Sequence, residues 1–235
     1  MTQEQLNKII EKHQHYLNKD IDGWESMKAD LSDKNLSGLD LRNANLIEAD
    51  LSNASLSNSN LRNANLNNAN LREANLYGAN LIEADLNNAD LIDADLNNAC
   101  LRYANLRKAC LRNANLRDAN LRNADLSCAN LRKADLSYVD LRDADLRKAD
   151  LRDADLNNAD LRDADLNNAC LRYANLRKTA LRNVDLSETD MYEADLKEAN
   201  LFGSDLKNTN IVCAVINEDT KIDYPITCPE TGSFI

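Results

Sequence analysis

From Leu31 to Ile216 the chain repeats every five residues without an insertion or a deletion. The central residue of each unit is leucine, except at Met191, Ile211 and Ile216. The residue two places before it is usually alanine, and the residue directly before it is usually aspartate or asparagine. A fixed short period is the sequence signature of a solenoid, in which each repeat packs against its neighbours. The period constrains the fold more than any other feature of the sequence.

A period of five fits neither a regular helix nor a flat strand. Leucines five residues apart would spread around all sides of an α-helix, whose apolar face recurs every three or four residues. A strand alternates with a period of two. Asparagine and aspartate are also disfavoured inside strands and favoured in turns. The pattern therefore predicts a short extended piece and a turn in every unit, with leucine and alanine inward and the other three residues outward.

The tandem motif, seen clearly in LRNANLNNANLREANLYGANLIEADL (61–86), resembles the A(D/N)LXX motif of the pentapeptide-repeat family over residues 31–216. This resemblance implies an all-β solenoid, a right-handed quadrilateral β-helix with four units in each coil. The repeats would then form about nine coils, stacked about 4.8 Å apart as hydrogen-bonded strands are. Alanine two residues before each leucine indicates a narrow interior, and departures from alanine concentrate after Thr179.

Residues 1–30 precede the repeats and are expected to form a helical cap on the first coil, since the terminal units of solenoids are usually atypical. Thr2 is a candidate N-cap for an amphipathic helix that ends near Asn18. Trp24 is a candidate plug for the open end of the coil. The apolar stripe of the helix consists of Leu6, Ile9, Ile10, His13 and Leu17.

Residues 217–235 follow the repeats and contain both prolines of the chain, which favour an extended or turn path. Three roles stay open for this tail: a cap on the last coil, an interface with a partner, or a truncated connection to further sequence. Because open ends of a solenoid can pair with one another, the rod is expected to be either a monomer or an end-to-end homodimer.

Residues one coil apart would lie directly above one another, so the surface can be described as columns of residues about 20 apart. Two columns on opposite faces are rich in arginine and are candidate partner-facing surfaces. The first contains Arg102, Arg122, Arg142, Arg162 and Arg182. The second contains Arg112, Arg132, Arg152 and Arg172. A third candidate column contains Asp125, Asp145, Asp165 and Asp185.

Like charges stacked about 5 Å apart repel one another by about 1 kcal/mol in water, so arginine columns need neighbours of opposite sign. The aspartate column is expected to supply them, together with Asp143 and Asp163 beside the first arginine column. Two interpretations of the columns stay open. The charged columns form either a solvated surface that keeps the rod soluble or a surface that binds a partner.

The net charge of −11 argues against direct nucleic-acid binding, which requires a cationic face. The predicted function is therefore that of a non-enzymatic scaffold, a rigid rod that displays charged columns to an unknown protein partner. The family resemblance implies one alternative, because some members bind DNA gyrase as DNA mimics and protect it from quinolones. Against this alternative, the chain lacks phenylalanine at the central positions and lacks loops between its repeats.

The repeats carry no residues arranged for catalysis, a cofactor or a metal ion. Both histidines, His13 and His15, precede the repeats, so no histidine can act there as a general base. The glycines are scattered and form no phosphate-binding loop. No Cys-x-x-Cys or Cys-x-x-His spacing is present, so no zinc site is expected.

The N-terminus has no apolar leader, and no stretch of the chain is apolar enough to span a membrane, which predicts a soluble, cytoplasmic protein. Cysteine placement agrees with a reducing compartment. Cys110 and Cys170 share a column, but three coils would separate them by roughly 14 Å, whereas a disulfide needs Cα atoms within about 7 Å.

Overall fold

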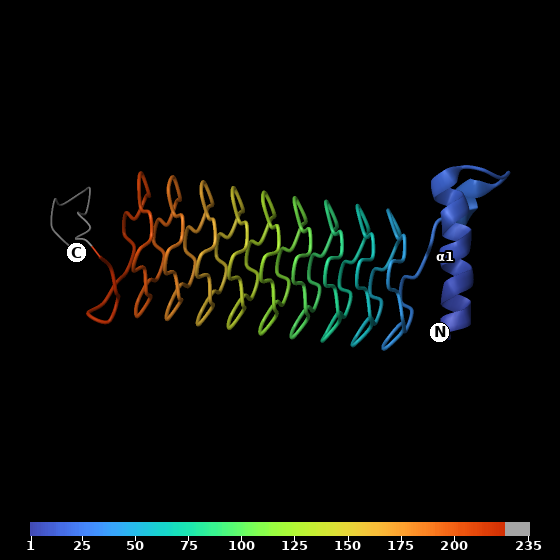
Figure 1. Ribbon diagram of the computed structural model, residues 1–235, viewed down its shortest axis with the longest axis horizontal. Helices are drawn as coiled ribbons and strands as arrows, with labels where there is room; N and C mark the ends of the chain where they lie inside the picture. Colours follow the sequence, from blue (N-terminus) through green and yellow to red (C-terminus); the bar gives the residue numbers. More distant parts are fainter. Residues whose placement is uncertain (224–235) are drawn as a thin grey trace.

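The computed structural model describes residues 1–223 and shows a rod of stacked coils with one helix across its N-terminal end (Figure 1). Helix α1 spans Gln3–Asn18, and a short 3-10 helix, η1, spans Trp24–Met27. Parallel bridges then join residues 20 apart, from Asp30↔Asp50 to Asp195↔Val215. Four five-residue units therefore make one coil. The expected right-handed quadrilateral β-helix is confirmed.

Each coil is built from tight turns rather than from strands of several residues. The carbonyl of each central leucine accepts the amide of the residue three places on, as in Ala124 N to Leu121 O at 3.0 Å. The second residue after the leucine has positive φ, such as 59° at Asn123. A left-handed residue at this place is the mark of a type II turn, and asparagine and aspartate tolerate it better than most residues. The pairing between coils consists of single-residue bridges.

Backbone hydrogen bonds join each coil to the next along the whole rod. The amide of Leu121 donates to the carbonyl of Asp140 at 2.8 Å, and the amide of Asn123 donates to the carbonyl of Arg142 at 3.0 Å. The same two donations recur in unit after unit. Since buried backbone groups must be paired, this regular ladder makes the rod a continuous hydrogen-bonded stack.

The interior is a stack of leucine layers lined by alanine, as the sequence predicts. Leu121 has no exposed surface and Ala124 is 1% exposed. Thr179, Thr189 and Ser204, which replace alanine, are also buried, and their hydroxyls donate to carbonyls of the preceding coil. Thr179 donates to Leu156 O at 3.0 Å, and Thr189 donates to Leu166 O at 3.1 Å. The narrow interior therefore accepts threonine without leaving its hydroxyl unpaired.

The aspartate or asparagine before each leucine closes the corner of the coil. Its side chain accepts the amide two residues further on, as in Arg122 N to Asn120 Oδ1 at 3.1 Å and Arg142 N to Asp140 Oδ1 at 3.2 Å. This is the Asx-turn that these two residue types form readily. A cysteine thiol at the same place is a poor acceptor. This local hydrogen bond explains why the motif uses aspartate or asparagine here.

Helix α1 covers the first coil, and its predicted N-cap is confirmed: Thr2 and Gln5 form a capping box. Leu6 of its apolar stripe has no exposed surface and joins the core, while Ile9 and Ile10 pack partly buried against it. The prediction that Trp24 plugs the coil is wrong. Trp24 is only half-buried and packs beside Tyr16, because Leu6 already fills the open end.

At the other end, the residues just after the repeats still pair with the coil below them. Lys221 forms a parallel bridge with Asn200, 21 rather than 20 residues away. The hydroxyl of Thr220 donates to Leu196 O at 3.0 Å. Residues 217–223 thus extend the stack with a one-residue shift in register. The rest of the predicted tail, 224–235, lies outside the described residues.

Candidate binding surface

The arginines of the two predicted columns fall into groups that differ in their partners. One group follows the sequence Asp-Leu-Arg, and each guanidinium folds back onto the aspartate of its own unit. Arg142 shows the geometry, with Nε and Nη2 at 2.8 and 2.6 Å from the two oxygens of Asp140. The pair holds the pKa of the Asp140 carboxyl below its usual range. The column arginines in this group are Arg142, Arg152 and Arg162. Arg42 and Arg147, which are not among the arginines of the two predicted columns, make the same contact.

Two further column arginines pair with acidic residues of the next coil instead. Arg122 Nε lies 3.1 Å from Asp143 Oδ2, and Arg172 Nη1 lies 3.3 Å from Asp190 Oδ2. Neither arginine has an aspartate two residues before it, so each reaches across the stack. Arginines paired in either way have their charge largely offset inside the protein.

The remaining column arginines, Arg102, Arg112, Arg132 and Arg182, form no ion pair with any described residue. The residue two places before each is cysteine, asparagine or alanine, so the within-unit carboxylate is missing. The Nε atoms of Arg102 and Arg132 are buried and have no hydrogen-bond partner within residues 1–223. These arginines keep their charge available for an external group.

The expectation that neighbouring carboxylates offset the arginine columns is confirmed for Asp143, which pairs with Arg122. It is wrong for the aspartate column. Asp145 and Asp165 both contact Arg147, at 2.5 and 3.5 Å, and that arginine belongs to neither predicted column. Asp125 and Asp185 each close a turn by accepting the amide of a serine two residues on. The aspartate column lies on a different side of the square coil from the two arginine columns, so its carboxylates interact with residues on their own side.

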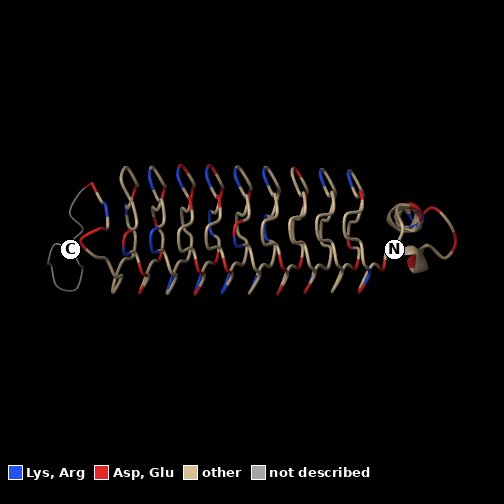
Figure 2. Cartoon of the chain, turned by 90° about the horizontal axis from the view of Figure 1, so that it is seen from below, with Lys and Arg blue, Asp and Glu red and all other residues tan. Residues whose placement is uncertain are grey.

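Charge is distributed unevenly along the rod, although basic and acidic segments are interspersed on the coils (Figure 2). Residues 99–134 contain eight Lys and Arg and two Asp, a net charge of +6. Residues 1–98 contain eight basic and 16 acidic residues, a net charge of −8. Residues 135–235 contain 12 basic and 21 acidic residues, a net charge of −9. We call residues 99–134 the cationic belt.

The cationic belt also displays aromatic rings beside its arginines. Tyr103 is 51% exposed, and the guanidinium of Arg102 lies 5.5 Å from its ring centroid. Tyr138, just beyond the belt, is 49% exposed, and the guanidinium of Arg117 lies 5.1 Å from its ring centroid. Stacked arginine and tyrosine side chains are the types that contribute most to binding at protein interfaces.

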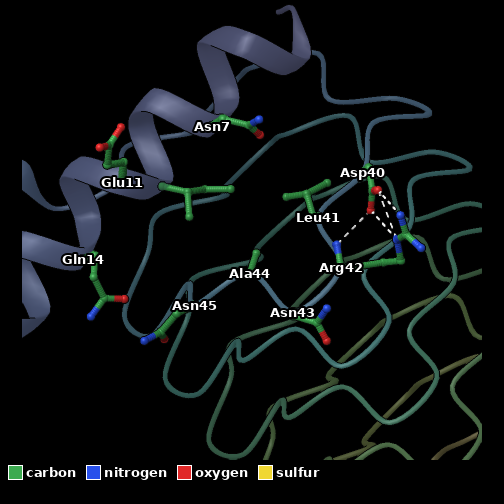
Figure 3. Close-up of a pocket in the computed structure, with 10 residues that line it drawn as sticks. Asn7, Glu11, Gln14, Asp40, Leu41, Arg42, Asn43, Ala44 and Asn45 are labelled. Atoms are coloured by element: carbon green, nitrogen blue, oxygen red, sulfur yellow. Dashed lines mark hydrogen bonds and ion pairs between the residues drawn. The ribbon is translucent and has the colours of Figure 1, made fainter.

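A separate cleft of about 480 Å³ lies between α1 and the first coil (Figure 3). Asn7, Glu11 and Gln14 of α1 line one side of it, and Asp40 and Arg42 lie on the other. Two of its charged groups are paired with each other, since Arg42 Nη2 lies 2.6 Å from Asp40 Oδ2. The cleft therefore presents amide groups and the carboxylate of Glu11 to a ligand, and the cationic belt, with its unpaired arginines, is the stronger candidate for binding.

Comparison with known sequences decides the family. The sequence profile described as pentapeptide repeats matches in several copies between residues 27 and 208. The chain belongs to the pentapeptide repeat family. No curated protein matches it.

Two solved pentapeptide-repeat structures are similar over most of this chain. HetL, described as involved in heterocyst differentiation regulation in the cyanobacterium Nostoc, is 36% identical, with a TM-score of 0.52 over 83% of this chain and 92% of HetL. QnrB1, described as a plasmid-mediated fluoroquinolone resistance protein, is 17% identical, with a TM-score of 0.51 over 78% of this chain and 94% of QnrB1. At 17% identity the likeness to QnrB1 concerns the fold alone.

In this pentapeptide-repeat protein, the cationic belt is not apparent from any single column, because a column follows one side of the rod. The belt crosses all four sides of one coil, because Arg102, Arg107, Arg112 and Arg117 occupy four successive units. Each column contains residues from the cationic belt and from the acidic segments on both sides of it, so its total charge does not reveal the belt. Summing charge over windows of one coil, about 20 residues, reveals the belt from the sequence. No helix among the described residues is long and apolar enough to cross a membrane.

Proposed function

We propose that this pentapeptide-repeat protein is a non-enzymatic interaction rod whose cationic belt binds an acidic surface of a protein partner. The observation that carries the proposal is the set of unpaired arginines within the belt, including Arg102 and Arg112. A guanidinium already paired with a carboxylate must lose that partner before it binds another, whereas an unpaired one can add an interaction directly. The acidic flanks strengthen specificity, because they repel an acidic partner that docks out of place.

The fold supports a binding role in two further ways. A stack with continuous backbone hydrogen bonds presents its side chains with little freedom, so less entropy is lost on binding. HetL, 36% identical, is described as acting in regulation of differentiation, which fits a protein that works by contact. The belt also places the exposed rings of Tyr103 and Tyr138 beside arginines, and these residue types anchor many interfaces.

The proposal is tested by affinity capture from an extract of the native cells, followed by measurement with the purified partner. The belt variant Arg102→Glu/Arg112→Glu reverses two unpaired charges. The control Arg182→Glu reverses a third unpaired arginine that lies outside the belt. We expect the wild type and the control to bind one acidic partner, and the belt variant to lose it. Binding should also weaken as salt rises. Equal binding by all three proteins would refute the role of the belt.

The alternative of a DNA mimic that binds DNA gyrase requires continuous negative potential along a face of the rod. The belt interrupts that potential, since its charge of +6 separates flanks of −8 and −9. We therefore expect no effect of the protein on gyrase supercoiling, with or without a quinolone. Inhibition or protection at low micromolar concentration, lost on reversing charge at Asp125, Asp145 and Asp165, would replace the interaction rod with the gyrase binder.

Oligomeric state bears on the same proposal. Helix α1 covers the first coil, so an end-to-end contact through that end would have to displace it. We propose a monomeric rod. A monomeric mass in light scattering would agree with this, and a doubled mass would point to pairing of the rods at their other end.

A further inference from the structure

A small notch interrupts one side of the rod at the edge of the cationic belt. Ser127 occupies the place in its column between Arg107 and Arg147, which lie one coil before it and one coil after it. Cys128 lies in the same way between Lys108 and Lys148 in the adjoining column. Because stacked side chains are only about 5 Å apart, two short residues between four long ones leave a hollow, with a volume of about 330 Å³.

The walls of the notch carry free positive charge. Arg107, Lys108 and Lys148 form no ion pair with any described residue. Arg107 and Lys148 line the hollow. Arg147 also lines it but is held by Asp145 at 2.5 Å. Asp125 is the one carboxylate among the lining residues, so the two lining cations without an ion pair, Arg107 and Lys148, exceed it by one charge.

The floor of the notch offers a hydroxyl donor that has no partner. In the other Asp-Leu-Ser units the serine hydroxyl donates to the aspartate of its own unit, as Ser137 does to Asp135 at 2.6 Å. Ser127 is only 8% exposed, and its hydroxyl forms no hydrogen bond with any described residue, although its amide donates to Asp125. Because this side chain is largely buried and its hydroxyl has no partner among the described residues, the hydroxyl can donate to a ligand or to solvent in the hollow.

We propose that this notch is a binding site for the phosphoryl group of a phosphate monoester. A phosphoryl group has three terminal oxygens and carries close to two negative charges at neutral pH. The notch offers three kinds of donor from different sides: the guanidinium of Arg107, the ammonium of Lys148 and the hydroxyl of Ser127. The two unpaired cations outnumber the one lining carboxylate, which favours an anion. A carboxylate, with only two oxygens, would leave one of the three donors unused, whereas a phosphoryl group has an oxygen for each.

The site is independent of the proposed partner-binding function, because it would take up inorganic phosphate even if no protein bound the belt. It also lies on a different side of the coil from Arg102 and Arg112, so the variants that test the belt leave it intact. A phosphate monoester can reach it free in solution or on a phosphorylated side chain. These two sources share the same chemistry and are separated by the choice of probe.

Two exposed cysteines provide a direct readout. Cys128 lines the notch, whereas Cys213 is exposed elsewhere on the rod, and neither forms a disulfide with another cysteine of residues 1–223. Alkylation by iodoacetamide is followed at each cysteine by peptide mass spectrometry as inorganic phosphate is added at constant ionic strength. We expect phosphate to slow the modification of Cys128 several-fold and to leave Cys213 unchanged. Equal rates with and without phosphate, or equal slowing at both cysteines, would overturn the site.

Variants test the same site by phosphorus NMR titration of inorganic phosphate. Ser127→Arg fills the notch and should abolish binding, while the matched variant Ser137→Arg fills the equivalent place on another column and should retain it. Arg107→Gln removes one charge-assisted donor and should weaken binding about tenfold. Circular dichroism confirms that each variant is folded. Binding that survives in Ser127→Arg, or that Ser137→Arg weakens as much, would overturn the site.

The source of the phosphoryl group is decided with peptides. A phosphoserine peptide, its unphosphorylated counterpart and inorganic phosphate are titrated into the wild-type protein. Tighter binding of the phosphopeptide than of inorganic phosphate, by about tenfold or more, assigns the site to phosphorylated side chains. Equal affinity of these two probes assigns it to a free phosphate monoester. Equal binding of the phosphorylated and unphosphorylated peptides would overturn a phosphoryl site.

Discussion

The imidazole of His13 accepts a hydrogen bond from the backbone amide of Ala29 through Nδ1, at 3.1 Å. Nε2 must then carry the proton, and it donates to the carbonyl of Ile47 at 2.9 Å. A neutral histidine with no exposed surface thus joins helix α1 to the first coil at two points. Burial lowers the pKa of His13 from its ordinary value of 6.5. A protonated His13 would lose its acceptor and bury a charge, so attachment of the cap depends on pH.

Acidification should therefore loosen the cap before it affects the coils. Because the pKa of His13 is lower in the folded state, its contribution is fully present above about pH 6.5 and is lost as pH falls through the folded value. Trp24, the single tryptophan of the chain, packs 5.7 Å from Tyr16 in the cap, so its fluorescence reports this region. We expect the denaturant midpoint for unfolding of the cap, followed by Trp24 fluorescence, to be lower at about pH 5 than at about pH 7.

Two substitutions separate the histidines. His13→Asn should lower the midpoint of cap unfolding at neutral pH and should remove most of its dependence on pH. His15→Asn, at an exposed residue that contacts Asp20, should leave the pH dependence unchanged. An unchanged pH dependence in His13→Asn would show that another group controls the cap.

The cysteines before leucine are predicted to be weak points of the coil. With Cys110 in this place, the amide of Arg112 has no side-chain acceptor among the described residues, whereas Arg122 N donates to Asn120 at 3.1 Å. Cys110→Asn should restore the Asx-turn and raise the free energy of unfolding by about 0.5–1.5 kcal/mol. The reverse change, Asn120→Cys, should lower it by a similar amount. Chemical denaturation checks both, and a loss of stability in Cys110→Asn would contradict the role assigned to the turn.

Asp140 should matter more as a turn acceptor than as a charge. It accepts the amide of Arg142 at 3.2 Å and also forms the two-point contact with its guanidinium. Arg142→Gln should cost less than about 1 kcal/mol, since a solvent-accessible ion pair contributes little. Asp140→Ala removes both interactions and should cost more than Asp140→Asn, which keeps an acceptor oxygen. If Asp140→Asn and Asp140→Ala prove equal in denaturant unfolding, the charge rather than the turn dominates.

Removal of the cap should convert the rod into a self-associating protein. Helix α1 covers the open backbone edge of the first coil, and such edges pair readily with other chains. A chain lacking residues 1–27, or the full chain with Leu6→Asp, should form dimers or larger species in light scattering. Lys8→Gln, at an exposed residue of the same helix, serves as the control and should leave the mass unchanged. A monomeric mass for both altered chains would show that the edge is protected without α1.

The candidate surface could be predicted from the sequence only in part. The column arginines do lie on the surface, and Arg142 and Arg152 can be assigned to aspartates of their own units, because Asp-Leu-Arg is a contiguous motif. The pairing of Arg122 with Asp143 links residues 21 apart, and the direction in which its side chain leans depends on the stack. The notch at Ser127 likewise depends on which side chains of three successive coils point into one hollow.

The turn and the corner of each unit were determined by the sequence alone, since their hydrogen bonds join residues two or three apart within one or two units. The amide of Arg122 needs only Asn120, and Ala124 needs only Leu121. The tertiary structure decided the partners of His13, which lie 16 and 34 residues away, and the positions of the free cations. Such contacts arise only after the coils stack and α1 docks, because they bring together residues whose spacing along the chain carries no periodic signal.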